Sequence, residues 1–259
     1  MKLNAIPARH GVLWVKMGIT TFLRQPLALS GLFFIFMAVM SVLSLVPVLG
    51  SVLALTLLPG ATLGLMAATQ EALKGKFPMP GVLFSGFRAG RKQLRAMLVL
   101  GVLYASGFVL LLGISALVDG GKFAQLYLIG GAIGAETVAD SNFELAALVA
   151  MAMYLPLSLM FWHAPALVHW HGITPVKSMF FSIVACSRNF GAFAVYGLVW
   201  VAVFVLVGTT IALLASLSGS EDLVAAILLP CAMVMAAMFF TSIYFSFTDT
   251  FGATVEHLA

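Results

Sequence analysis

The sequence predicts an all-α polytopic membrane protein with six transmembrane helices. Of its 259 residues, 62% are hydrophobic and only 8% are charged, whereas about 25% of the residues in an ordinary soluble domain carry charge. The 46 residues between Arg24 and Glu71 include no charge, and a helix needs only ~20 residues to cross the hydrocarbon core. Backbone amides in lipid have no water to bond with, so a membrane-spanning segment must be a helix or part of a closed barrel. These apolar runs lack the two-residue alternation of polar and apolar side chains that a barrel strand shows, so the spans are predicted to be helices.

Six apolar stretches are the predicted spans, near 27–46, 48–70, 96–118, 145–168, 192–217 and 223–247. The first 26 residues are too long and too amphipathic to lead a secretory signal peptide, so we expect no cleavage. Cys186 and Cys231 lack the CxxC spacing of a zinc ribbon and indicate no disulfide framework. The chain is predicted to form a single membrane domain, residues 1–259.

The positions of the basic residues predict the orientation. Twelve of the 13 lysines and arginines lie at the N-terminus, between the second and third spans, or between the fourth and fifth, and Lys122 is the exception. Loops rich in lysine and arginine stay in the cytoplasm, so both termini are predicted to be cytoplasmic in a bacterial inner membrane. The opposite side carries Asp119, Glu136, Asp140, Glu144, Glu221 and Asp222. The basic residues behind the net charge of +4 are thus distributed as a signal of membrane orientation, and we predict no nucleic-acid partner.

Three basic segments share one plan, an amphipathic stretch, an arginine and an apolar span. They read VKMGITTFLRQPLALSGLF, VLFSGFRAGRKQLRAMLVL and VKSMFFSIVACSRNFGAFAVYG, and they align Arg24, Arg91 and Arg188. The second span of each unit contains a leucine-proline step, at Pro59, Pro156 and Pro230, and a proline inside a helix bends its axis. We expect three repeat units, about 8–73, 79–171 and 173–250, with an external insert at about 119–143 that includes a short helix.

Each amphipathic stretch is interpreted as a helix in the cytoplasmic headgroup layer. In the first, the apolar face is Val12, Val15, Ile19 and Phe22, opposite Arg9, Lys16, Thr20 and Arg24. In the second, Leu83, Phe87 and Leu94 oppose Ser85, Arg88, Lys92 and Arg95. In the third, which Thr174 and Pro175 begin as N-cap and first-turn residue, apolar Phe180, Ile183 and Val184 accompany a polar stripe of Ser178, Ser182 and Asn189. The candidate lipid or partner contacts are Arg9, Lys16, Arg24, Arg88, Arg91, Lys92, Arg95, Lys177 and Arg188.

One run of residues carries a resemblance to a known family: Ala164-Pro165, Gly172-Ile173-Thr174-Pro175, Ser178, Ser182, Cys186, Arg188-Asn189 and Ala192. It resembles the signature of an uncharacterised six-span inner-membrane protein family of β-proteobacteria. The hairpin unit is also similar to the membrane domains of bacterial glycerophosphodiester phosphodiesterases. The resemblance implies a helical inner-membrane protein without catalysis, because the phosphodiesterase catalytic domain has no counterpart in this chain. It also implies that His163 and His169 lie outside the family's pattern.

The stretch FWHAPALVHWHG, residues 161–172, holds three of the five histidines. If 145–172 is one helix at 100° per residue, His163 and His169 are about 120° apart and His169 and His171 about 160° apart, so they do not converge on a metal. We interpret Trp162 and Trp170 as an aromatic belt with hydrated histidines at headgroup level. His163 stays the candidate intramembrane polar site, because ionisable residues inside spans are often functional.

The remaining candidate features favour packing over chemistry. Gly60 and Gly64, and likewise Gly86 and Gly90, have GxxxG spacing, which permits close helix packing. Two acidic residues, Glu71 and Asp249, end spans 2 and 6 and are expected to pair with Arg24, Arg91 or Arg188. No P-loop, HExxH, GxSxG or paired-carboxylate motif is present. We therefore predict no catalytic residue, metal ligand or cofactor.

The leading functional prediction is a non-enzymatic scaffold, accessory subunit or lipid-organising protein whose partners are anionic membrane lipids. Three basic amphipathic stretches on one side support it, and another membrane protein or a second copy of the chain is a further possible partner. The alternative is a small transporter or channel for a neutral or lipophilic solute, because repeated proline-broken spans are common in transporters. A metal- or haem-binding redox protein is the third class.

Overall fold

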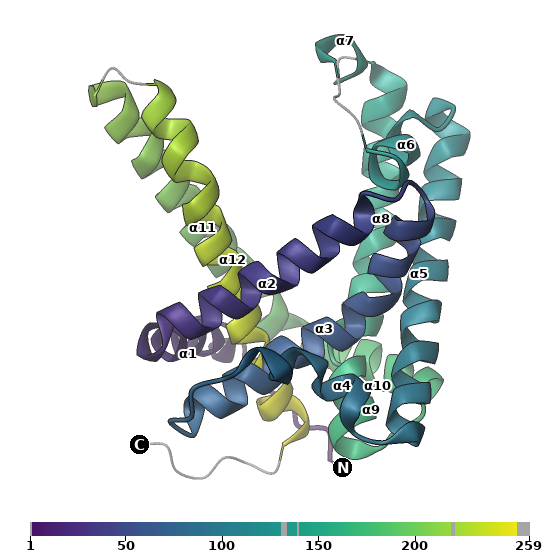
Figure 1. Cartoon of the computed structure of the whole chain (residues 1–259), viewed down its shortest axis with the longest axis vertical. Coiled ribbons are helices and arrows are strands. Elements are labelled where there is room, and N and C mark those ends of the chain that lie inside the picture. The colour runs from purple at the N-terminus through teal and green to yellow at the C-terminus, as the bar shows by residue number, and fades with distance from the viewer. Residues whose placement is uncertain (1, 131–133, 139, 219–220, 253–259) are drawn as a thin grey trace. The chain divides into compact units, whose positions relative to one another are not determined.

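The computed structural model describes residues 2–130, 134–138, 140–218 and 221–252, and these ranges contain helices but no strand (Figure 1). Within these ranges, six helical segments are long and apolar enough to span a membrane. They are α2 (Pro26–Ser44), α3 (Leu49–Leu73), α5 (Arg91–Asp119), α8 (Ser141–Trp162) continued by α9 (Ala164–His171), α11 (Phe190–Ser218) and α12 (Glu221–Phe251). The predicted all-α class and its six spans are confirmed.

Shorter helical segments connect the long ones: α1 (His10–Arg24), the 3₁₀ turn η1 (Pro80–Phe84), α4 (Ser85–Arg88), α6 (Lys122–Leu128), α7 (Ala135–Val138) and α10 (Pro175–Arg188). The chain divides into two compact units. Unit 1 comprises Met1–Ile35, Gly64–Leu83 and Ala185–Ala259, and unit 2 comprises Phe36–Leu63 and Phe84–Val184. The proposed repeat boundaries stay a prediction.

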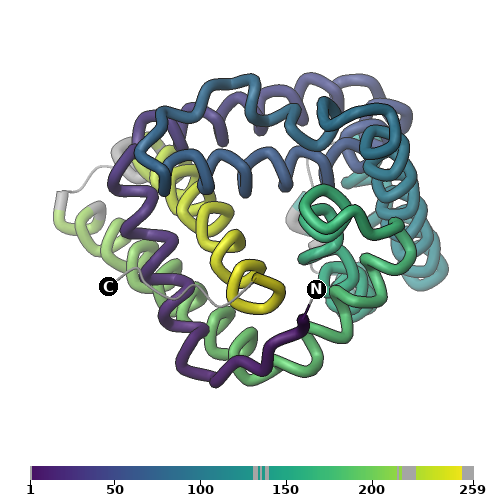
Figure 2. Tube along the Cα trace, turned by 90° about the horizontal axis from the view of Figure 1, so that it is seen from below, coloured from purple at the N-terminus to yellow at the C-terminus, as the bar shows by residue number. Residues whose placement is uncertain are grey.

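In unit 1, helix α1 packs along α11 and α12 (Figure 2). Its buried residues are Gly11, Trp14, Val15, Gly18, Thr21 and Phe22, whereas Val12 is 47% exposed. Val15 and Phe22 of the predicted apolar face therefore pack on protein, and the placement of the helix in the headgroup layer stays a prediction. The helix turns its glycines inward because they let the backbones approach closely: a Cβ at Gly18 would overlap Ser242, and one at Gly11 would overlap the Ala192 carbonyl.

Asp249 fastens α1 to α12, and its partners correct the predicted pairing with an arginine. Its carboxylate accepts hydrogen bonds from the Trp14 Nε1 (2.7 Å) and bonds the His10 Nδ1 (2.9 Å). The preceding segment is held by Asn189, which donates from Nδ2 to the Asn4 carbonyl (3.1 Å). Asn189 also accepts the Ile6 N–H at 2.8 Å. At Asp249, the Trp14 indole and the His10 imidazole thus take the place expected for a guanidinium.

In unit 2, α5 and α8 run side by side (Figure 1) and α6 packs on both. Gly101 lies against the Thr56 carbonyl of α3. Gly60 faces the Phe87 ring, and a Cβ at Gly86 would lie 3.0 Å from the Leu63 side chain. Gly60 and Gly86 thus lie in close packing, as interpreted from the sequence, whereas Gly90 has no neighbour within 4 Å of an added Cβ.

The second basic segment is not one amphipathic helix, which corrects the sequence prediction. The chain forms η1 and α4, breaks at Gly90 with a φ of 101°, and starts α5 at Arg91. Such a positive φ favours glycine, since it carries no Cβ. Arg24, Arg88 and Arg188 each end a short helix, whereas Arg91 begins a long one, and the alignment of the three repeats stays a prediction.

Helix α10 begins at Pro175, as predicted, and buries its polar stripe. Ser178 and Ser182 are entirely buried, whereas Phe180 is 62% exposed. The Ser182 hydroxyl donates to the Leu159 carbonyl (2.7 Å) and accepts the backbone N–H of His163 (2.9 Å). This polar-in arrangement suits a helix whose outer surroundings are lipid, where small hydroxyl residues join helices.

The insert at about 119–143 contains the predicted short helix, α6, while 131–133 and 139 lie outside the described residues. Asp119 caps α6 by accepting the backbone N–H groups of Gly121 (2.8 Å) and Phe123 (2.6 Å). Lys122 bonds Asp140 at 2.7 Å. This ion pair raises the pKa of the Lys122 ammonium and lowers the pKa of the Asp140 carboxyl.

Candidate functional site: a basic cluster at the start of α5

Three of the predicted contact residues gather in the first turns of α5. Arg91, Lys92 and Arg95 are all exposed, and we call them the α5 basic cluster. In the same unit, the Arg88 guanidinium lies 5.7 Å from the Phe84 ring centre, and Lys177 lies in the first turn of α10. The other predicted contacts, Arg9, Lys16, Arg24 and Arg188, belong to unit 1.

The cluster borders two surface hollows. One, of about 430 Å³, is lined by Arg91, Leu94, Arg95, Leu98, Val99, Val102 and Leu103. The other, of about 630 Å³, is lined by Arg91, Lys92, Arg95, Ala96, Val99 and Pro175. Both share Arg91, Arg95 and Val99, which are four residues apart and form one ridge of the helix. Each hollow is thus lined by basic side chains at the start of α5 and by apolar side chains further along the same helix.

The electrostatics of this end favour an anion. Gly90 caps α5 without any side-chain hydrogen bond, and the first turn has no acidic residue. The first N–H groups of a helix lack partners within the helix, and its N-terminus carries a partial positive charge. Among the described residues, no carboxylate pairs with the α5 basic cluster. Three cations and a helix N-terminus therefore face one surface region without internal neutralisation.

His163 occupies a break in the fourth span, which corrects the assumption of a continuous helix. Helix α8 ends at Trp162 and α9 starts at Ala164, with Pro165 in its first turn. His163 is entirely buried, so the prediction of a hydrated headgroup-level side chain was wrong for this residue. His169 and His171 lie in the last turn of α9. Within the described residues, no group of three or more His, Cys, Asp or Glu side chains is placed to hold a metal ion.

The three predicted kink prolines lie inside long helices: Pro59 in α3, Pro156 in α8 and Pro230 in α12. Each lacks an N–H for the carbonyl four residues earlier, which weakens the helix at that turn. Their positions are confirmed, while the bends and their role in function stay predictions.

Sequence reasoning missed two features. The first is the hydrogen-bonded group around Asp249, and the second is a pair of aromatic-lined cavities beneath α6. The phenylalanines and tyrosines of the cavities are scattered over four helices, so their linear order indicated nothing. The sequence feature that could have indicated the group around Asp249 is an acidic residue at the end of an apolar span.

The six apolar helices among the described residues define a polytopic α-helical membrane protein. The chain is 39% identical over 255 residues to a "Probable inner membrane protein" of Burkholderia thailandensis, covering 97% of this chain and 94% of that protein. The chain belongs to this family of multi-pass inner-membrane proteins. No family model matches the chain. No solved structure matches it either, and the resemblance to phosphodiesterase membrane domains and the cytoplasmic termini stay predictions.

Proposed function

We propose that this protein is a non-enzymatic lipid-organising element of the inner membrane that holds anionic phospholipid at the α5 basic cluster. One observation carries the proposal: Arg91, Lys92 and Arg95 surround hollows that continue into an apolar groove on the same helix. A phospholipid has the same two parts, an anionic headgroup and hydrocarbon chains.

The chemistry of the groove matches such a lipid. Arginine offers a planar fork of N–H donors that binds phosphate through two hydrogen bonds, and lysine adds a point charge. The unpaired first-turn N–H groups of α5 add further donors for a phosphate oxygen. Below the headgroup, Leu94, Leu98 and Val102 line an apolar path for an acyl chain.

A lipid-binding measurement tests the proposal. The purified chain is titrated with phosphatidylglycerol and phosphatidylcholine in detergent, and bound lipids are counted by native mass spectrometry. Each basic residue near an anionic lipid surface contributes about 1 kcal/mol. The combined variant Arg91→Gln, Lys92→Gln, Arg95→Gln should therefore lose roughly 100-fold of the preference for phosphatidylglycerol, since about 1.4 kcal/mol corresponds to tenfold.

A matched control removes three charges elsewhere. The variant Lys2→Gln, Lys74→Gln, Lys76→Gln has the same change in net charge but leaves the α5 basic cluster intact. We expect it to keep the preference for phosphatidylglycerol. An equal loss of this preference in both variants would show that it depends on net charge and not on the α5 basic cluster. An unchanged preference in the cluster variant would refute the site.

A further inference from the structure

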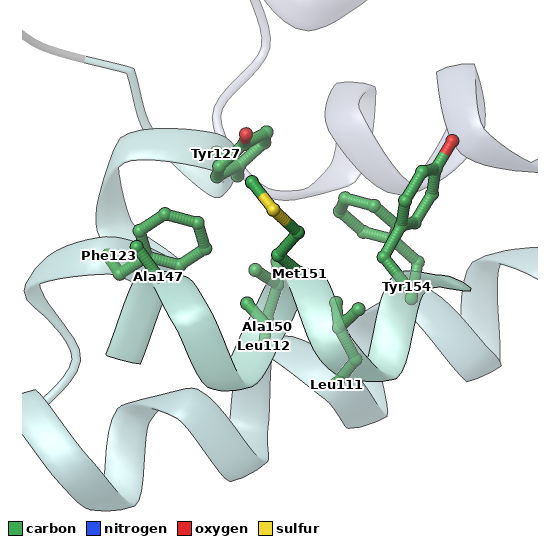
Figure 3. A pocket seen from close by; sticks show the side chains of 9 residues that line it. Leu111, Leu112, Phe123, Tyr127, Ala147, Ala150, Met151 and Tyr154 are labelled. Atoms are coloured by element: carbon green, nitrogen blue, oxygen red, sulfur yellow. The ribbon is translucent and has the colours of Figure 1, made fainter. Parts of the chain in front are cut away.

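Unit 2 contains another hollow, far along α5 from the basic cluster. Its lining residues come from α5, α6 and α8 (Figure 3): Phe108, Leu111, Leu112, Phe123, Tyr127, Ala147, Ala150, Met151 and Tyr154. Its volume is about 420 Å³, within the range of small-molecule sites. Phe108 lies 17 residues after Arg91, or about 26 Å along a helix, so this cavity belongs to the opposite end of the span.

A neighbouring cavity of about 320 Å³ lies between α2, α3, α5 and α6. It shares Phe108 and Tyr127 with the first cavity. These two rings meet edge to face, with their centres 5.9 Å apart. The aromatic pair thus stands between two lobes, one against α8 and the other against α2 and α3.

Helix α6 covers both lobes. Phe123 and Tyr127 line the first, and Tyr127 and Leu128 line the second. The Leu128 carbonyl accepts hydrogen bonds from the Val48 N–H (2.9 Å) and the Ser51 hydroxyl (3.1 Å), which tie the end of α6 to the start of α3. Helix α6 therefore borders both lobes, and we call the surface around its first residue, Lys122, the rim.

The charges at this rim are of both signs. Lys122 immediately precedes the lining residue Phe123 and bonds Asp140, which begins α8 as its N-cap. A headgroup with a phosphate and an ammonium matches this arrangement, the phosphate beside the lysine and the ammonium beside the carboxylate. A purely anionic headgroup would instead meet the Asp140 carboxylate without a cation of its own.

We infer that the two lobes beneath α6 bind one two-chain zwitterionic glycerophospholipid, with one acyl chain on each side of the Phe108 and Tyr127 pair. The headgroup lies at the Lys122 and Asp140 rim. Aromatic rings, leucines and an adaptable methionine form walls suited to hydrocarbon. This site is separate from the α5 basic cluster and does not rest on the function proposed above.

Filling one lobe at a time tests the inference. Ala150→Phe fills the first lobe and Ala54→Phe fills the second, because both alanines are buried lining residues. Leu148→Phe and Leu53→Phe are the controls, on exposed positions of the same helices. The probes are palmitoyl-oleoyl phosphatidylethanolamine and its single-chain lyso form, bound to the purified full chain and counted by native mass spectrometry.

Each filling variant should weaken binding of the two-chain lipid at least about tenfold. Each buried CH₂ of a lipid contributes about 0.8 kcal/mol, so losing two is enough. The lysolipid should keep its binding in either variant, because the other lobe stays open. Unchanged two-chain binding in both variants, or an equal loss in the controls, would overturn the inference. A filling variant that lost binding of the lysolipid as much as binding of the two-chain lipid would also overturn the inference.

A second measurement on the unaltered chain covers the case in which a filling variant does not fold. Phosphatidylethanolamine with a photoreactive diazirine on one acyl chain is crosslinked in vesicles, and the adducts are mapped by peptide sequencing. Adducts within 104–128 and 143–154 are expected whichever chain carries the diazirine, together with adducts on 36–58 from the second lobe. Adducts confined to other segments would contradict the site.

Discussion

Gly101→Leu should lower the free energy of unfolding of unit 2 by more than about 3 kcal/mol. Overpacking a core usually costs about 1–3 kcal/mol, and at Gly101 the added Cβ would overlap the Thr56 backbone carbonyl rather than a movable side chain. Helices α3 and α5 would have to separate. Unfolding in a titration with sodium dodecyl sulfate, followed by circular dichroism, measures the change.

Gly113→Leu is the matched control, since Gly113 lies on the same helix with no neighbour within 4 Å of an added Cβ. Leucine is a better helix former than glycine by roughly 1 kcal/mol, so this variant should be as stable as the parent or slightly more so. Equal stability of the two variants would show that α3 and α5 do not approach at Gly101.

Asp249→Ala should destabilise unit 1 by about 1–3 kcal/mol, the cost of leaving a buried donor without an acceptor. Trp14 is completely buried, and Asp249 accepts its indole N–H at 2.7 Å. The His10 contact is partly exposed to solvent, so its share is smaller. Hydrogen exchange followed by mass spectrometry should show faster exchange of the α1 amides.

Two controls separate this contact from a general loss of charge. Asp249→Asn keeps an oxygen that accepts the indole N–H, so we expect a smaller effect. Glu71→Ala removes the acidic residue that ends the second span and should leave the exchange of α1 unchanged. If Glu71→Ala accelerated α1 exchange as much as Asp249→Ala, the hydrogen bond to Trp14 would not be what holds α1.

The spans were predictable because their main determinant, the transfer of uncharged side chains into hydrocarbon, is read directly from the sequence. The first predicted span, 27–46, appears as α2 over Pro26–Ser44, and the start of α10 at Pro175 followed from proline chemistry. The break at His163 was also within reach of that chemistry. Pro165 cannot donate to the carbonyl four residues earlier, and proline disfavours helical backbone in the residue before it.

The inward faces of the short helices were not predictable from hydrophobicity. Lipid is as apolar as a protein core, so a hydrophobic face indicates lipid or protein equally. In α10 the exposed side is Phe180 and the buried side is Ser178 and Ser182. The contact of α1 with α11 and α12 depends on Gly11 and Gly18, and a hydrophobicity pattern does not mark glycines as contact residues.

The residues of the candidate site were predicted from the sequence, but the helix that carries them was not. Arg91, Lys92 and Arg95 were selected for their charge, and the sequence placed them on a separate surface helix. The turn at Gly90 instead makes them the start of α5 itself. This difference joins the cations to the apolar groove of the same helix, which the proposed lipid site requires.

The central claim is that the basic end of α5 faces the anionic cytoplasmic leaflet while the α6 end faces the opposite side. Cysteine labelling measures this directly, with Lys92→Cys and Glu136→Cys made separately in a chain whose Cys186 and Cys231 are replaced by alanine. In intact cells, a membrane-impermeant maleimide should label position 136 and leave position 92 unlabelled, and in inverted vesicles the pattern should reverse. Labelling of position 92 from outside the cell, with position 136 protected, would contradict the account.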